Sequence, residues 1–282
     1  MLNPEQKQRQ QQIITELGVK ASIDPVFELN QRIQFIKDYV RVSRTRSLVI
    51  GISGGIDSLV VGCMAQLAAE QLRLEGVDAS FIALRLPYGE QADAADAAAA
   101  IRHIQPDFCM ELNIKAATDA TIETLLQADQ RFSSEAQLDF IKGNIKARQR
   151  MIQCYAVAAA ESGLVLGSDH AAEVLMGFFT KYGDGAADLM PLAGLTKSQV
   201  RQLADQCDVP DALIYKTPTA DLESLSPLQP DEAAFGGVTY EQIDAFLTGQ
   251  EVPVSVFEII DRYFTASAHK RHLPATPLTS SL

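Results

Sequence analysis

The chain has 282 residues, of which 47% are hydrophobic and 21% are charged, a composition typical of a globular protein with enough apolar material for one sizeable domain. It carries 36 acidic against 24 basic residues, a formal net charge of −12, which disfavours a nucleic-acid partner. No apolar run is long enough to span a membrane, and the polar start MLNPEQKQRQQQ lacks the apolar segment of a secretory signal. We therefore expect a cytoplasmic protein.

The first predicted elements are two helices, at 4–17 and 28–44, which we expect to pack outside the active site. The apolar stripe of the second consists of Val26, Leu29, Ile33, Ile36 and Val40. Strands then alternate with helices, which indicates a parallel sheet with right-handed crossovers. Strands are predicted at 47–52, 79–86, 108–113 and 163–167. The intervening helices are predicted at 58–75, 91–104, 116–128 and 134–161.

The C-terminal third has a different composition. Residues 217–237 are rich in Pro, Ser, Asp and Gly and show little periodicity. This pattern is typical of a linker or solvated loop, and equally of a lid that orders over a substrate. Helices are predicted to follow at 239–247 and 252–267. The cysteines Cys63, Cys109, Cys154 and Cys207 lie far apart, which favours packing residues over a zinc site or disulfides.

The most informative segment is LVIGISGGIDS, residues 48–58. A buried strand that leads through two glycines into a helix N-terminus is typical of a phosphate site, because the helix start offers unsatisfied N–H groups and a positive dipole end. Asp57 adds a carboxylate that can hold Mg²⁺ beside phosphate oxygens. The alternative is an ordinary turn in which Asp57 or Ser58 caps the helix. The loop resembles the pyrophosphate loop of the N-type ATP pyrophosphatases, which split ATP into AMP and pyrophosphate.

A second polar segment, 143–163, begins a long helix with basic charge. Lys142, Lys146, Arg148 and Arg150 crowd its early turns. Basic charge near a helix start opposes the helix dipole unless an anion is bound. Taken alone, the stretch is better explained as a solvated charged face.

The third segment, 165–200, follows another buried strand. Ser168 or Asp169 is expected to cap the next helix, and Glu173 in that helix should face the same edge of the sheet as Asp57, where two carboxylates suit a hard cation. His170 is interpreted as a cap-region residue rather than a ligand. From spacing alone, Phe178 and Phe179 are assigned to the core. Near the C-terminus, the basic group 269–272 either binds an anion or solubilises an exposed terminus.

Together these segments resemble the ammonia-dependent NAD synthetases. The matching motifs are SGGIDS (53–58), RLPYGEQ (85–91), GNIKARQRM (143–151), LGSDHAAE (166–173), GFFTKYGDGAADLMPLAGLTK (177–197), KTPTADL (216–222) and HKRHLP (269–274). The resemblance implies an adenine-nucleotide α-hydrolase-like fold, in which helices sandwich a Rossmann-like parallel sheet. It also implies a single synthetase domain over 1–282, with a helical extension at 1–45 and further helices at the C-terminus, and a homodimer. By the same resemblance, 217–237 is a lid.

The activity that the resemblance implies has two steps. The nicotinate carboxylate of deamido-NAD is first adenylylated by ATP with Mg²⁺, which releases pyrophosphate. Ammonia then displaces AMP and NAD is formed. Because the chain begins close to the synthetase motifs and nothing in it resembles a glutaminase or nitrilase domain, we expect free ammonia, or ammonia from a separate protein, as the nitrogen donor.

The resemblance also assigns site residues by motif. The ATP phosphates are assigned to Gly51, Ile52, Ser53, Gly54, Gly55, Ile56, Asp57 and Ser58. Asp57 and Glu173 are the implied magnesium ligands, and Asp57 and Lys197 are the implied catalytic residues. Further ATP contacts are Ser168, Lys197 and Thr219. Deamido-NAD is assigned to Arg148, Lys181, Asp188, His269 and Lys270, partly at the dimer interface.

Two positions in the phosphate loop depart from the family pattern. Ile56 stands where Gln is frequent, and Leu59 where a hydroxyl residue is common, but neither change removes a phosphate donor or metal ligand. The alternatives are another ATP pyrophosphatase, such as the synthetase part of a GMP synthetase or a tRNA-modifying ligase, and a non-catalytic nucleotide-binding module similar to universal stress proteins. The acidic charge opposes a tRNA substrate, and a binding module has no use for Glu173 and Lys197 together.

Overall fold

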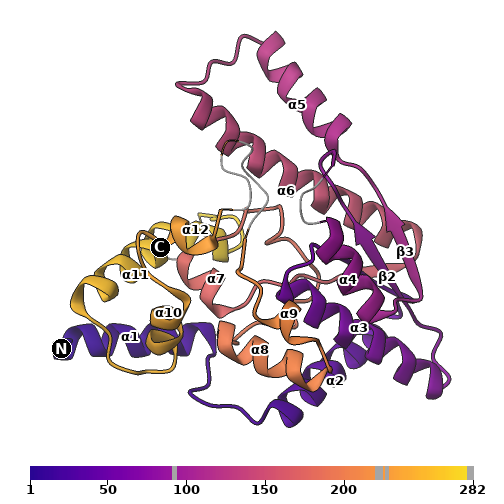
Figure 1. Ribbon diagram of the computed structural model, residues 1–282, viewed down its shortest axis with the longest axis horizontal. Coiled ribbons are helices and arrows are strands. Elements are labelled where there is room, and N and C mark those ends of the chain that lie inside the picture. Colours follow the sequence, from indigo (N-terminus) through magenta and orange to yellow (C-terminus); the bar gives the residue numbers. More distant parts are fainter. Residues whose placement is uncertain (91–93, 220–224, 226–228, 278–282) are drawn as a thin grey trace.

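A computed structural model describes residues 1–90, 94–219, 225 and 229–277 (Figure 1). Parts of two predicted segments, 91–93 of one helix and 220–224 and 226–228 of the expected lid, lie outside these described residues. The strands are β1 (Ser47–Gly51), β2 (Ser80–Arg85), β3 (Phe108–Glu111) and β4 (Gly163–Val165). The helices of the first half are α1 (Pro4–Leu17), α2 (Pro25–Ser43), α3 (Ile56–Leu74), α4 (Ala94–Ile104), α5 (Lys115–Gln127) and α6 (Glu135–Ala160). Those of the second half are α7 (Ala171–Met176), α8 (Lys197–Gln206), α9 (Asp211–Ile214), the 3₁₀ helix η1 (Asp231–Phe235), α10 (Tyr240–Leu247), α11 (Val254–Ala266) and α12 (Ala268–Arg271).

The strands form one parallel sheet in the order β3-β2-β1-β4. Val49 of β1 pairs with Ile82 on one side and with Val165 on the other. The strand order reverses between β1 and β4, and ligands of such sheets bind at the carboxyl ends of the strands beside that reversal. The predicted parallel α/β fold is confirmed. Each strand is one to two residues shorter at its carboxyl end than its sequence pattern suggested, because the chain leaves the sheet to form the loops that carry the site.

Helices cover both faces of the sheet, which explains the continuous apolar runs of the strands. On one face, α3 packs on β1 and β2 and is itself covered by α2, α4 and α8. On the other face, α6 packs on β1 and β4. Leu48 and Ile50 point into the first layer and Val49 into the second, as the alternation of side chains along a strand requires.

A second apolar cluster joins α1, α7, α10 and α11, which lie together at one side of the molecule (Figure 1). Phe235 of η1 and Phe246 of α10 are fully buried within it. This cluster holds α7 and the beginning of α10 against the sheet domain, and both of these segments reach the candidate site.

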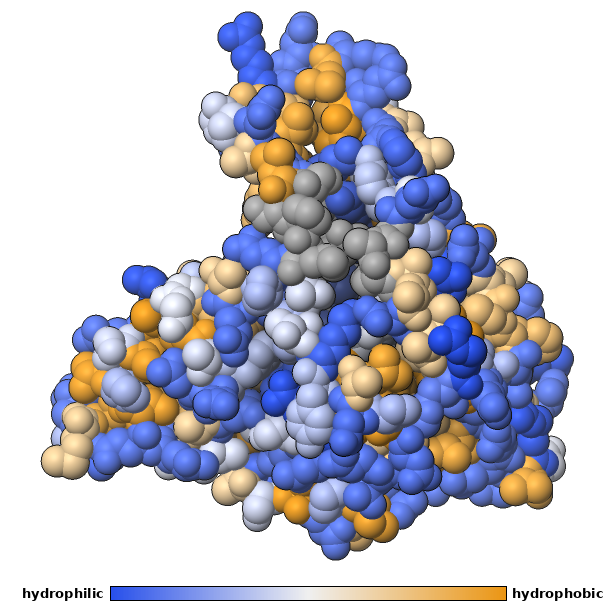
Figure 2. Space-filling view, in the orientation of Figure 1, coloured by the Kyte–Doolittle hydropathy of each residue, from blue (hydrophilic) through white to orange (hydrophobic). Residues whose placement is uncertain are grey.

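Helix α5 and the first half of α6 project as an arm from the body of the molecule (Figure 1). The face in Figure 2 is mostly hydrophilic, with apolar side chains gathered in a few places, the arm among them. Leu126 and Phe140 on the arm are 51% and 59% exposed. Phe108 and Met110 on the edge strand β3 are also exposed.

The burial of individual residues corrects one sequence prediction and refines another. Val26 does not belong to the buried stripe of α2, because it sits in the first turn of the helix and is 55% exposed, whereas Leu29, Ile33, Ile36 and Val40 are buried. Cys63 and Cys154 are buried and Cys207 is partly buried, as predicted for packing residues, whereas Cys109 on the edge strand β3 is exposed and is not one. No helix in the described ranges combines the length and apolarity needed to cross a membrane.

Candidate active site

The loop between β1 and α3 leaves the start of the helix without a side-chain cap. Gly55 occupies the capping position and no side chain bonds to the helix start there, so the alternative in which Asp57 or Ser58 caps α3 is wrong. The first N–H groups of an α-helix have no partner within the helix. This end of α3 therefore keeps its capacity to bind an anion.

Hydrogen bonds inside the loop fix its shape. The backbone N–H of Ser53 donates to Ser58 Oγ over 3.2 Å, and the two serine hydroxyls lie 3.1 Å apart. Gly54 has φ +89°, and a Cβ at this position would lie 2.6 Å from the backbone nitrogen of Ala97 in α4. Only glycine therefore fits here. The two departures from the family pattern, Ile56 and Leu59, are both buried in the core cluster, and Ile56 also borders the cavity.

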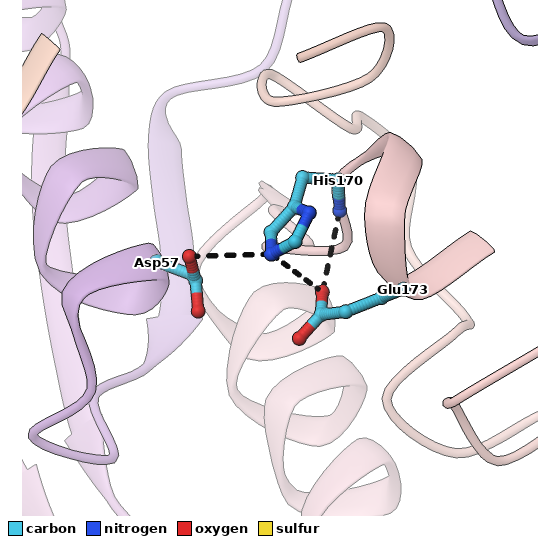
Figure 3. Close-up of side chains that lie close together, drawn as sticks. All are labelled: Asp57, His170 and Glu173. Atoms are coloured by element: carbon cyan, nitrogen blue, oxygen red, sulfur yellow. Dashed lines mark hydrogen bonds and ion pairs between the residues drawn. The ribbon is translucent and has the colours of Figure 1, made fainter. Parts of the chain in front are cut away.

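Two carboxylates and one imidazole converge where the loops after β1 and β4 meet (Figure 3). His170 Nε2 lies 3.6 Å from Asp57 Oδ1 and 3.6 Å from Glu173 Oε2. Glu173 Oε2 also accepts the backbone N–H of His170 at 3.3 Å. The cap of α7 is His170. It was correctly placed in the cap region, whereas the predicted caps, Ser168 and Asp169, precede it because the chain becomes helical only at Ala171.

The pKa values of these three side chains are shifted in different directions. Burial acts to raise the pKa of Asp57, but the ammonium of Lys197 outweighs it and holds that pKa below the usual value. Burial and the nearby charge of Asp57 raise the pKa of Glu173 well above its usual range. Burial lowers the pKa of His170 to about 3, which leaves the imidazole neutral. A cation would relieve the repulsion between the two carboxylates.

The same residues fit a hard divalent cation. One ligand atom from each of Asp57, His170 and Glu173 lies within 4.8 Å of the others. Asp57 Oδ1 is buried and has no hydrogen-bond partner among the residues that the structure describes, as expected of an oxygen that binds a ligand. Carboxylate oxygens are the donors that Mg²⁺ prefers.

Lys197 supplies the main positive charge beside this cluster. Thr196 caps α8 by accepting the backbone N–H of Gln199. The Lys197 side chain is buried, and its Nζ donates to Asp57 Oδ2 over 2.7 Å. Burial opposes the charged form, yet the carboxylates of Asp57 and Glu173 raise the pKa of Lys197 overall. The sequence offered no acidic neighbour within one helical turn, because the partner lies 140 positions away.

A cavity of about 490 Å³ opens above this cluster. The predicted site residues that line it are Gly51, Ile52, Ser53, Gly55, Ile56, Asp57, Ser58, Ser168, Glu173, Lys197, Thr219 and Lys270. The structure thus brings together the residues assigned to ATP and metal, with Gly54 immediately behind them. All the residues that line the cavity lie at or beyond Ile50, consistent with the prediction that the N-terminal helices pack outside the site.

The residues assigned to deamido-NAD are arranged differently. Arg148 Nε donates to the carbonyl of Lys181 at 3.3 Å, and Lys181 Nζ donates to the carbonyl of His269 at 2.6 Å. Lys270 reaches the cavity, where its Nζ donates to the carbonyls of Gly177 and Phe179. Asp188 is not among the lining residues, since its carboxylate accepts the backbone N–H of Val165 at 2.7 Å.

Several cavity residues escaped the sequence analysis. Asp169, Asp184 and Asp231 line the cavity beside the assigned residues. Burial raises the pKa of Asp231 to about 6. The sequence signal for Asp169 was its place directly after a strand, which was interpreted only as a cap. Asp231 lies in an aperiodic acidic stretch and gave no signal of its own.

Two other interpretations change with the structure. Lys146 is not part of a solvated face, because it is 2% exposed and its Nζ lies 4.5 Å from the centroid of the Tyr88 ring. Phe178 packs edge-to-face on Phe235, at 5.1 Å between ring centroids, and so joins the second apolar cluster as predicted. Phe178 and Phe179 are both partly exposed and line the cavity, so they serve the site as well as the core.

Known proteins resemble this chain over most of its length. The NAD synthase family profile matches residues 28–274. The NH(3)-dependent NAD(+) synthetase of Burkholderia pseudomallei is 50% identical over 276 residues, which cover 98% of this chain and 97% of the relative. A crystal structure of NAD+ synthetase from Burkholderia pseudomallei has 49% identity and a TM-score of 0.83, covering 97% of this chain and 100% of that one. NMN synthetase from Francisella tularensis has 35% identity and a TM-score of 0.77, covering 92% and 100%.

Proposed function

The chain belongs to the NAD synthase family, and from that premise we propose how its cavity forms the amide of NAD from ammonia. The enzyme is a ligase of NAD biosynthesis. A carboxylate resists attack by ammonia, so ATP must first convert one of its oxygens into a leaving group. In the proposed first step, the nicotinate carboxylate of deamido-NAD attacks the α-phosphorus of ATP. The bond to the β-phosphate oxygen breaks, and pyrophosphate leaves.

The protein groups that act in this step are the phosphate loop and Lys197. The N-terminus of α3 and the hydroxyls of Ser53 and Ser58 bind the phosphate oxygens. Lys197, held 2.7 Å from Asp57, places a fixed positive charge beside the reacting phosphorus. Much of the catalysis of phosphoryl and nucleotidyl transfer comes from such alignment and charge stabilisation.

Asp57 and Glu173 are the residues that would hold Mg²⁺. Support comes from the two converging carboxylates and the unpartnered Asp57 Oδ1. When bound, Mg²⁺ neutralises charge on the phosphate oxygens and on the departing pyrophosphate. With Mg²⁺ bound, Asp57 and Glu173 would hold the triphosphate at the carboxyl ends of β1 and β4.

In the second step, ammonia attacks the carbonyl carbon of the adenylate, the bond to AMP breaks, and the attacking nitrogen gives up a proton. Asp231 lines the same cavity, and because its pKa is raised only to about 6, its carboxylate is ionised at neutral pH and can accept this proton. The cavity volume of about 490 Å³ matches the usual size of a ligand site.

One observation carries the proposal. Carboxylates that follow two different strands meet at the reversal of strand order, and a buried lysine and a helix N-terminus lie beside them. This arrangement places a metal, a triphosphate and a fixed cation within one cavity. A non-catalytic nucleotide-binding module would not need the buried charges of Asp57, Glu173 and Lys197, which are costly to place in a protein interior.

The direct test is a product assay. The purified protein is incubated with Mg-ATP, deamido-NAD and ammonium, and we expect equimolar NAD, AMP and pyrophosphate. ADP as the product would exclude the proposed chemistry, and binding of ATP without turnover would favour a binding module. Glutamine in place of ammonium should give no product.

The acid substrate requires its own control, because a relative with 35% identity is named NMN synthetase. Nicotinate mononucleotide is the acid that such an enzyme would amidate. We expect this chain to prefer deamido-NAD, in keeping with its greater identity to NAD synthetases. A higher kcat/KM for the mononucleotide would reassign the substrate while leaving the two-step chemistry intact.

The proposal includes the molecule's wider organisation. We infer one synthetase domain with a helical extension at 1–45, in a homodimer in the cytoplasm. Exposed apolar residues on β3 and the α5–α6 arm support an interface between copies. The segment 217–237 acts as a lid, because Thr219 pairs with Pro230 at its base and Thr219 lines the cavity. Light scattering during size-exclusion chromatography tests the dimer, since a monomer mass would exclude it.

A further inference from the structure

The ammonium of Lys197 has contacts of two kinds. One kind is polar: Nζ donates to Asp57 Oδ2 over 2.7 Å and lies 3.5 Å from His170 Nε2. The other is aromatic: Nζ lies 5.1 Å from the centroid of the Tyr240 ring. A cation within about 6 Å of a ring centroid is attracted by the electrons of the ring face, most strongly where water is excluded. Lys197 and Tyr240 are 1% and 4% exposed, so the contact is well shielded from water.

These contacts do not respond alike to a bound nucleotide. Asp57 is shared between Lys197 and the proposed metal, so its hold on the ammonium weakens when a cation takes up its oxygens. The Tyr240 ring offers no ligand atom from its face and does not compete for metal or phosphate. Its attraction for the ammonium therefore persists through the reaction.

Tyr240 is itself fixed by η1, which lies within the proposed lid 217–237, directly after Pro230. Its hydroxyl donates to Asp231 Oδ2 at 3.1 Å, and its backbone N–H donates to Glu232 Oε1 at 2.7 Å. Its ring packs edge-to-face on Phe235, with centroids 5.2 Å apart. Burial and the charges of Glu173 and Asp231 raise the pKa of the Tyr240 hydroxyl, which therefore stays protonated and able to donate.

The other end of the same connection reaches the cavity. The backbone N–H of Asp231 donates to the carbonyl of Pro218 at 3.1 Å, and Pro218 and Thr219 line the cavity. A continuous series of contacts thus runs from the base of the lid through η1 and the Tyr240 ring to the Lys197 ammonium. The ring's position depends on that of η1.

We propose that Tyr240 is a positioning residue, whose ring holds the Lys197 ammonium on the phosphate side of the cavity and makes the placement of that charge depend on η1 and the base of the lid. The inference rests on the proposed function, in which Lys197 contacts ATP and Asp57 holds the metal. It adds a residue that touches neither substrate nor metal.

The test compares the binding of Mg-ATP, by titration calorimetry, across ring variants. Tyr240→Leu removes the ring, and we expect the Kd for Mg-ATP to rise about 30-fold, the equivalent of about 2 kcal/mol for a desolvated cation–ring contact. Tyr240→Phe keeps the ring, so its rise in the Kd for Mg-ATP should be less than a third of that seen with Tyr240→Leu. Phe246→Leu is the matched control, because Phe246 is a fully buried ring of the same helix that packs against Phe257. It should lower the thermal midpoint while leaving the Kd unchanged.

A second series avoids the cavity that leucine leaves. Phenylalanine analogues with one, two and three ring fluorines are incorporated at position 240. Fluorination weakens the ring's attraction for a cation with little change in shape, so the Kd should rise stepwise. A flat series, or an equal rise in Phe246→Leu, would overturn the proposal in favour of plain packing. Wild-type formation of AMP and NAD is assayed in parallel, so a flat series with normal product removes only the Tyr240 inference.

Discussion

The two sides of the cavity hold their charges in different ways. The metal side, defined as Asp57, Glu173 and Lys197, is built on segments that follow β1 and β4 and on the start of α8, and its side chains contact one another or His170. The tail side is defined as Arg148, Lys181, His269 and Lys270, of which Lys270 lines the cavity. The side chains of Arg148, Lys181 and Lys270 donate to backbone carbonyls instead. Arg148 and His269 are exposed. The side chains of the metal side are therefore held in place before a ligand binds. The cations of the tail side contact carbonyls rather than carboxylates, so their charge is left for an anionic substrate.

The two sides should therefore differ in their effects on stability and on substrate affinity. Charges that are buried together are costly without their ligand, so the metal side should lower the stability of the free enzyme. Exposed cations near carbonyls cost little and contribute mainly when an anionic substrate arrives. Changes on the metal side should therefore alter turnover and stability strongly, and changes on the tail side should alter substrate affinity alone.

The largest effect is expected from Asp57→Asn. The substitution removes the proposed metal ligand and the charge that holds Lys197, so kcat should fall about 100- to 1000-fold, or about 3–4 kcal/mol in barrier. Steady-state release of pyrophosphate measures the change, and far-UV circular dichroism should show an intact fold. Near-normal turnover would remove Asp57 from the metal side.

A pH-dependent stability change is expected from Asp231→Asn. Burial raises the pKa of Asp231 from 3.8 to about 6, so the folded state favours the protonated form. The protonated side chain contributes fully to stability below about pH 4, and this contribution is lost as the pH rises through 6. The loss amounts to about 3 kcal/mol in the free energy of unfolding at pH 7. The variant should melt at a higher temperature than wild type at pH 7 and at the same temperature below pH 4. An equal difference at both pH values would contradict this assignment.

The phosphate loop can be tested with a pair of glycines. Gly54→Ala combines a positive φ with a Cβ only 2.6 Å from a backbone nitrogen, and should cost about 2 kcal/mol in the free energy of unfolding while raising the KM for ATP. Gly76→Ala has a similar φ, +81°, with nothing within 4 Å. It should therefore cost about half as much and leave the KM unaltered. Equal costs would show that the contact with α4 does not shape the loop.

The smallest effect is expected on the tail side, from Lys270→Ala. The KM for deamido-NAD should rise about tenfold, equivalent to about 1.4 kcal/mol, with kcat and the KM for ATP nearly constant. Initial rates at varied substrate concentrations separate these parameters. A change confined to the KM for ATP would place Lys270 on the metal side and contradict the distinction between the two sides.

Much of this architecture could be predicted from the sequence, because parallel strands bring their carboxyl ends to one edge of a sheet. Asp57 and Glu173 were placed together on that ground, and the phosphate loop was recognised from its glycines. Lys197 was assigned only through the family resemblance, since its partner is remote in sequence. The burial of Lys146 beneath Tyr88 was missed, because helical spacing does not show which neighbour covers a face.

Residues that act through contacts between distant segments were also missed. His170 has the sequence signature of a cap and is one, yet its imidazole lies between the two carboxylates only because α7 starts beside the first turn of α3. Tyr240 has the signature of an ordinary apolar helix residue. Nothing in its local pattern distinguishes it from Phe246, and only the packing of α10 against α8 brings its ring to Lys197.

The separation of 140 positions between Asp57 and Lys197 has a consequence for biosynthesis. A growing chain that has already emerged with its phosphate loop still lacks the lysine that neutralises it, so the nascent protein cannot hold nucleotide there as the finished enzyme does. Catalytic competence then arrives late and all at once, when the segment beyond β4 docks.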